Sequence, residues 1–169
     1  ENLSPAGYAV AGDFDRLPVQ FRAIAGDLAT GDPVVLARGD LARAVRASMS
    51  IPLVFPPVPW EGRSLVDGPI VNNLPIDVAK EFGGAVLVAV DIGSPRHEPD
   101  DYVSALGVAS QVSDLLMRRR YLDFSAEADV LVRPDLGDHS STDYSGFDEL
   151  IQKGYEATKA SLPAIRTKL

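Results

Sequence analysis

Residues 85–92 have the sequence A-V-L-V-A-V-D-I, a continuously apolar run that is rich in valine. Such a run is typical of a strand buried on both faces of a parallel sheet, because no side of that strand faces solvent. Gly83 and Gly84 precede the run and are expected to end a helix over Pro75–Phe82. The stretch therefore predicts a core strand of an α/β fold.

The segments that follow continue the alternation of helix and strand. Apolar residues recur at helical spacing over Tyr102–Leu122, which predicts a long amphipathic helix. Asp129–Val132 is expected to form another strand and Phe147–Ser161 another helix, which Pro163 should interrupt. This alternation predicts an α/β fold with a mainly parallel sheet flanked by helices and joined by right-handed crossovers.

The segments that precede the run predict a hairpin and a capped helix. Gln20–Ala25 and Pro33–Ala37 are expected to be strands joined by a turn over Asp27–Asp32. Asp40 is suited to cap a helix over Leu41–Ser48, because its carboxylate accepts a hydrogen bond from a first-turn N–H. Residues 1–18 are expected to be a connecting segment, and residues 19–169 the α/β core of one domain.

Residues 51–60, I-P-L-V-F-P-P-V-P-W, are apolar but contain prolines at positions 52, 56, 57 and 59. Proline lacks the N–H that a central strand donates, so an irregular loop is predicted here. Two interpretations stay open for this loop. It packs on the core, or it lines a ligand site, since such sites are mostly apolar.

Charge and composition exclude several classes of function. The chain has 169 residues, with 16 Lys and Arg against 24 Asp and Glu, a net charge of −8. This balance argues against nucleic-acid binding and against electrostatic docking to an anionic membrane. The basic run Arg118–Arg120 is expected to be a solvated helix face. No cysteine is present, which excludes disulfides and thiol chemistry.

Asp67 is the carboxylate best placed for chemistry. It follows a short strand predicted over Ser64–Val66, and sites in α/β sheets form at the carboxyl ends of strands. Asp67-Gly68 is also a common turn pair, so a purely local role stays open. Asp91 ends the run at residues 85–92, and we expect it to terminate that strand and to hydrogen-bond a neighbouring loop.

Other polar residues do not form a recognisable site. His97 and His139 are possible general bases, but their polar surroundings predict surface positions. Asp138, His139 and Asp143 lack the spacing of a metal site, so no metal and no cofactor are expected. The sequence contains no G-x-S-x-G elbow and no phosphate-binding loop, which disfavours a small nucleotide-binding domain.

Taken together, several ordered segments resemble the patatin-like phospholipases, a family of lipid acyl hydrolases, and most densely over residues 20–92. They are F-R-A-I-A-G-D-L-A-T-G from residue 21, G-D-L-A-R-A-V-R-A-S-M-S-I-P from residue 39, G-R-S-L-V-D-G-P-I-V-N-N-L-P from residue 62 and G-G-A-V-L-V-A-V-D-I from residue 83. A weaker similarity continues through A-D-V-L-V-R-P-D-L and F-D-E-L-I-Q-K-G-Y-E-A. The chain thus resembles the C-terminal portion of the family's domain.

The resemblance implies a Ser-Asp dyad that hydrolyses a lipid or other ester. Asp67 corresponds to the dyad aspartate, while the serine and the oxyanion loop are expected on an N-terminal segment that acts as a partner. Without that segment the fold is expected to be incomplete, because apolar strand edges would be open. Phe55 and Trp60 are candidate contacts for acyl chains, and transient membrane-surface contact is possible.

One position departs from the family pattern. The family commonly has Asp-Gly-Gly, whereas this chain has Asp67-Gly68-Pro69. Proline removes a backbone donor, so any role for an N–H at position 69 is lost.

A non-catalytic interaction or assembly module derived from such a domain is the alternative function. The compartment is open between cytoplasm and cell envelope, and the lipid head group is not determined.

Overall fold

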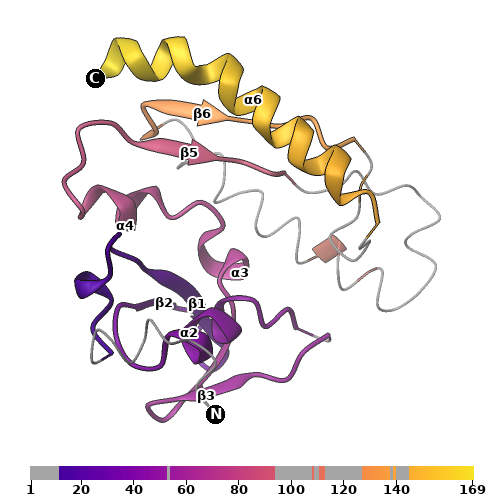
Figure 1. The fold of residues 1–169 in the computed structure, drawn as a ribbon. Helices are drawn as coiled ribbons and strands as arrows, with labels where there is room; N and C mark the ends of the chain where they lie inside the picture. Colours follow the sequence, from indigo (N-terminus) through magenta and orange to yellow (C-terminus); the bar gives the residue numbers. More distant parts are fainter. Residues whose placement is uncertain are drawn as a thin grey trace. The chain divides into compact units, whose positions relative to one another are not determined.

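The computed structural model describes residues 12–52, 54–93, 108, 111–112, 127–137, 139 and 145–169 (Figure 1). These residues fall into two compact units, Glu1–Pro75 and Ile76–Leu169. The helix predicted over Tyr102–Leu122 lies outside the described residues, except for helical residues at 108 and 111–112.

The first unit contains a four-stranded sheet in the order β2-β1-β4-β3. Its strands are β1 (Ala23–Asp27), β2 (Pro33–Leu36), β3 (Val58–Trp60) and β4 (Arg63–Asp67). All three pairings are antiparallel, and Ala25 on β1 lies opposite both Val34 and Asp67. The hairpin of β1 and β2 is confirmed, because the turn after Asp27 is short enough to return the chain beside β1.

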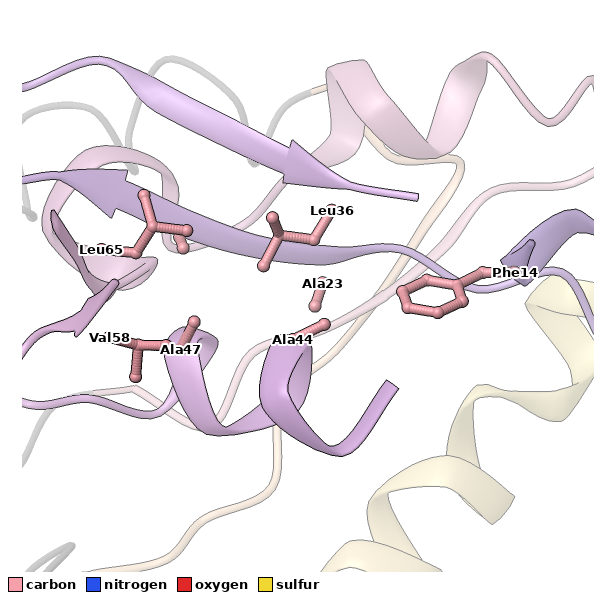
Figure 2. Packing of buried hydrophobic residues seen from close by; sticks show 8 residues of the cluster. Phe14, Ala23, Leu36, Ala44, Ala47, Val58 and Leu65 are labelled. Atoms are coloured by element: carbon pink, nitrogen blue, oxygen red, sulfur yellow. The ribbon is translucent and has the colours of Figure 1, made fainter. Parts of the chain in front are cut away.

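Helix α2 (Leu41–Ser48) is confirmed with the predicted cap and bounds. The Asp40 Oδ1 accepts a hydrogen bond from the Arg43 N–H at 3.0 Å. Ala44 and Ala47 are fully buried and face the sheet, as Figure 2 shows. Their small side chains allow α2 to lie close to β1 and β4, which α2 contacts.

The core of this unit lies between α2, the sheet and the short helix η1 (Phe14–Arg16). Its buried apolar residues are Phe14, Ala23, Ala25, Leu36, Ala44, Ala47, Val58 and Leu65. Phe14 comes from the segment expected to be a connection, yet its side chain is completely buried (Figure 2). Phe14 therefore forms part of the core of the first unit, and Leu17 of the same segment packs against it.

Two elements of this unit differ from the sequence prediction. Residues 58–60 form strand β3 and not an irregular loop. The strand is compatible with Pro59 because β3 lies at the edge of the sheet, where one side of its backbone needs no ladder partner. The short helix α3 (Pro69–Asn72) follows directly after β4 and was not predicted.

The second unit contains α4 (Ile76–Lys80), β5 (Val88–Val90), β6 (Val130–Val132) and α6 (Phe147–Lys168). Strands β5 and β6 pair in parallel, and α6 packs against β6 (Figure 1). This parallel pair, reached through a long connection, confirms the α/β class. A mainly parallel sheet is not confirmed, because the four-stranded sheet of the first unit is antiparallel throughout.

Two further expectations in the second unit are wrong. Val88 and Val90 are 39% and 55% exposed, so β5 is not buried on both faces. A valine-rich run predicts a strand, but its burial needs packing partners that the run itself does not contain. Helix α6 continues past Pro163 to Lys168. The fixed φ of proline is compatible with a helix, and the packing of α6 against β6 favours the helix over the break that a proline alone would favour.

No helix among the described residues is both long enough and apolar enough to cross a membrane.

Candidate active site around Asp67

The backbone of Asp67 is held from both sides at the end of β4. On one side Asp67 lies opposite Ala25 of β1 in the antiparallel ladder. On the other side its N–H donates to the Ser50 carbonyl oxygen at 3.0 Å, and the Gly68 N–H donates to the Ser48 carbonyl oxygen at 3.4 Å. The turn after α2 thus takes the place of β3, which pairs with β4 only as far as Leu65.

Gly68 is required at its position by space and not by its backbone angles. Its φ of −63° and ψ of −40° are open to any residue. A Cβ atom there would lie 2.2 Å from the Ile24 carbonyl oxygen on β1. Glycine therefore allows the chain to pass directly over β1 as it leaves Asp67.

Pro69 suits the structure that follows Gly68. Pro69 is the first residue of α3, where the N–H that proline lacks would have no partner within the helix. The Gly68 carbonyl oxygen accepts from the N–H groups of Val71 and Asn72 at 2.9 and 2.8 Å. Proline in place of the second glycine of Asp-Gly-Gly is thus the first residue of a short helix, which begins two residues after Asp67.

Burial raises the pKa of the Asp67 carboxyl from 3.8 to about 6, and a hydrogen bond from the Gly68 N–H opposes this shift. Desolvation disfavours the charged form of a carboxyl, so a partly buried aspartate holds its proton to higher pH. A carboxylate with a pKa near neutrality is a much stronger base than an exposed aspartate. Asp67 is therefore able to accept a proton at physiological pH.

Arg46 and Ser50, which the sequence analysis did not single out, fix the turn beside Asp67. The Ser50 side chain is completely buried. Its Oγ donates to the Arg46 carbonyl oxygen at 2.7 Å and accepts from Arg46 Nη1 at 2.5 Å. The Arg46 guanidinium carbon lies 4.7 Å from the centre of the Phe55 ring. In the sequence, the spacing of four between Arg46 and Ser50 is the only signal of this contact.

The two aromatic candidates, Phe55 and Trp60, are half-buried, and each lies beneath an arginine of α2. Arg43 lies 5.8 Å from the Trp60 ring centre and also donates to the Pro59 carbonyl oxygen. Val54, next to Phe55, is 54% exposed. Trp60 therefore packs against the core from β3, while the loop before β3 places Phe55 under Arg46 and leaves Val54 exposed.

Two other buried aspartates have structural partners. The Asp91 Oδ1 accepts from the Gly93 N–H at 2.8 Å, and its Oδ2 pairs with Arg133 Nε at 2.6 Å. This confirms that Asp91 bonds a loop after its strand. The Asp27 Oδ1 accepts from the Ala29 N–H at 3.0 Å and so stabilises the hairpin turn.

His139 is described and half-buried, whereas His97, Asp138 and Asp143 lie outside the described residues. Within the described part of the chain, no group of three or more His, Asp or Glu residues is placed to hold a metal ion.

The fold class and a partly buried carboxylate at the end of β4 define a candidate site, and comparison with known proteins shows the family. Residues 9–80 match the family described as patatin-like phospholipase. The patatin-like phospholipase domain-containing protein 7 of Mus musculus is 33% identical over 162 residues, which cover 79% of this chain. An uncharacterized NTE family protein of Mycobacterium bovis is 40% identical over 78 residues, or 46% of this chain.

The chain belongs, through residues 9–80, to the patatin-like phospholipase family of lipid acyl hydrolases, and the match covers a portion of the domain. The chain spans 12% of the length of the mouse relative and 13% of the length of the mycobacterial one.

Proposed function

We propose that this chain supplies the aspartate of a Ser-Asp dyad in an ester or phospholipid acyl hydrolase. The observation that carries the proposal is the position of Asp67, which is the last residue of β4 and has a carboxyl pKa raised to about 6. The serine nucleophile and the oxyanion donors lie on a segment that precedes these residues. Membership of the patatin-like phospholipase family supports this division of roles.

In the proposed reaction, the Asp67 carboxylate takes the serine proton as the serine oxygen attacks the ester carbonyl carbon. The tetrahedral intermediate collapses, the ester C–O bond breaks, and the leaving alkoxide receives the proton from Asp67. Water then attacks the acyl-enzyme, again with Asp67 as the base, and releases the fatty acid and the free serine. Asp67 must be ionised to begin the cycle, so activity should rise as the pH passes through about 6.

We place acyl-chain contact at the loop that precedes β3. Val54 exposes an apolar side chain there, and the half-buried rings of Phe55 and Trp60 lie close by in sequence. Apolar linings suit acyl chains, and exposed apolar side chains favour transient contact with a membrane surface. Substitution of Val54 by Asp should raise the KM for phospholipid vesicles more than the KM for a soluble short-chain ester.

The test of the dyad is hydrolysis by the full-length protein that carries these residues. Asp67→Asn keeps the size of the side chain but removes the base, so kcat should fall about 10²- to 10⁴-fold on p-nitrophenyl butyrate and on phosphatidylcholine vesicles. Asp32→Asn, an equal charge change at an exposed turn position, should leave kcat unchanged. Wild-type activity in Asp67→Asn would reject the dyad. Absence of hydrolysis in the wild type as well as in Asp67→Asn would favour the non-catalytic interaction or assembly module.

A further inference from the structure

The orientation of Asp67 depends on a turn that belongs to neither of its neighbouring strands. Strand β3 ends its pairing with β4 at Leu65, two residues before the carboxylate. Beyond Leu65, the Asp67 N–H donates to the Ser50 carbonyl oxygen. The Gly68 N–H donates to the Ser48 carbonyl oxygen. On the side away from β1, the backbone at Asp67 is therefore held by these two carbonyl groups.

The turn itself is held in place by side chains. The Ser50 Oγ returns to the last turn of α2, where it donates to the Arg46 carbonyl oxygen at 2.7 Å. The same Oγ accepts from Arg46 Nη1, and the guanidinium of Arg46 packs over the Phe55 ring. One buried hydroxyl thus connects α2, the turn at residues 49–51 and the loop that contains Phe55.

We propose that Ser50 and Arg46 are positioning residues that hold the Asp67 carboxylate in its reactive orientation. This inference rests on the proposed dyad. The Ser50 carbonyl oxygen that accepts from the Asp67 N–H and the Ser50 hydroxyl that bonds Arg46 belong to one residue. A shift of that hydroxyl therefore moves the carbonyl that holds Asp67. Small errors in the placement of a catalytic group reduce the rate of reaction strongly, with roughly 10²-fold lost for 1 Å.

The experiment compares Ser50→Ala with Ser64→Ala in the full-length protein. Both changes remove one serine hydroxyl, but Ser64 is exposed on β4 and pairs with Pro59 only through the sheet ladder. Ser50→Ala should lower kcat about tenfold and leave KM within about twofold, because orientation and not binding is lost. Ser64→Ala should match the wild type in both constants.

A second readout separates this inference from the dyad itself. In protein labelled with ¹³C at its aspartate carboxyl carbons, the Asp67 signal should titrate near 6 in the wild type. In Ser50→Ala the midpoint should fall towards 3.8, because a loosened strand end admits water to the carboxylate. A moved midpoint with no effect of Asp67→Asn on hydrolysis would support the positioning contact and reject the dyad.

Wild-type kcat together with an unmoved midpoint in Ser50→Ala would overturn the inference. If Ser50→Ala does not fold, as judged by circular dichroism, Arg46→Met decides the question. Methionine keeps the aliphatic packing over Phe55 but cannot donate to the Ser50 Oγ. The same loss of kcat at constant KM supports the inference, and wild-type kinetics reject it.

Discussion

At the scale of the residue, Asp67 combines a rigid backbone with a carboxyl that is costly to ionise. Its N–H is paired to Ser50, and its carboxyl pKa is raised to about 6 because the group is partly buried. The protonated form is thus favoured in the folded chain relative to the unfolded one. The partial burial that raises the pKa of Asp67 therefore reduces the stability of the fold at neutral pH.

Asp67→Asn should stabilise the protein in a pH-dependent manner. Between pH 3.8 and about 6 the folded wild type binds more protons at Asp67 than the unfolded chain, so its stability falls as the pH rises. Asparagine has no charge to desolvate and avoids this loss. In urea unfolding, the advantage of the variant should be absent below pH 3.8, grow up to about pH 6 and then stay constant. A constant difference at every pH would contradict the assignment, and Asp32→Asn is the control.

Gly68→Ala should be strongly destabilising, because the new methyl group would lie 2.2 Å from the Ile24 carbonyl oxygen. The strands must separate to accept it, at a cost of about 3 kcal/mol in the free energy of unfolding. Gly154→Ala is a suitable contrast, since its Cβ meets nothing within 4 Å and lies in α6. That change should stabilise by about 0.5–1 kcal/mol. Equal unfolding midpoints for the two variants would show that Gly68 is not constrained by space.

At the scale of the element, helix α2 connects the cap at Asp40 to the turn whose carbonyl groups accept from Asp67 and Gly68. Asp40 caps its first turn, two alanines bury its inner face, and its last turn leads into the carbonyl groups that hold Asp67. Helix α2 begins at a residue that the sequence identifies, and its packing sets where the turn after it lies. Stability of this helix is therefore connected to the geometry of the carboxylate.

Asp40→Ala should cost about 1 kcal/mol in the free energy of unfolding, because the Arg43 N–H loses its acceptor. Asp40→Asn keeps a side-chain oxygen at the same place, so it should lower the free energy of unfolding by only about 0.2 kcal/mol. Urea unfolding of the two variants measures the difference. Equal losses would indicate that the charge of Asp40, and not its capping hydrogen bond, stabilises the helix.

At the scale of the whole molecule, the first unit depends on a residue far from the site in sequence. Phe14 is completely buried among residues of β1, β2 and α2 (Figure 2). Phe14, which precedes β1, therefore belongs to the folded core of this unit. Any shortened form that begins after Phe14 removes part of the packing beneath the sheet.

Phe14→Ala should lower the free energy of unfolding by about 3–5 kcal/mol, since it removes a large buried ring and leaves a cavity. Val19→Ala, at a side chain that is 79% exposed, should change it by less than about 0.5 kcal/mol. Denaturant unfolding of both variants distinguishes a core residue from a residue of a linker. A small effect of Phe14→Ala would place this segment outside the core.

The sequence by itself determined the features that depend on neighbouring residues. The hairpin of β1 and β2, the cap at Asp40, the strand in the valine-rich run and the strand end at Asp67 were all predicted from local patterns. Each depends on turn chemistry, capping or the alternation of apolar residues over a few positions. These preferences act within one segment, so they are visible without knowledge of the rest of the chain.

Tertiary structure alone decided the remainder. Residues 58–60 form a strand despite Pro59 because they lie at a sheet edge, and Val88 and Val90 are exposed although their sequence is apolar. The hydrogen bond from the Asp67 N–H to the Ser50 carbonyl oxygen joins segments that no local pattern connects. Burial and long-range hydrogen bonds depend on which segments meet in space, and that is a property of the folded chain.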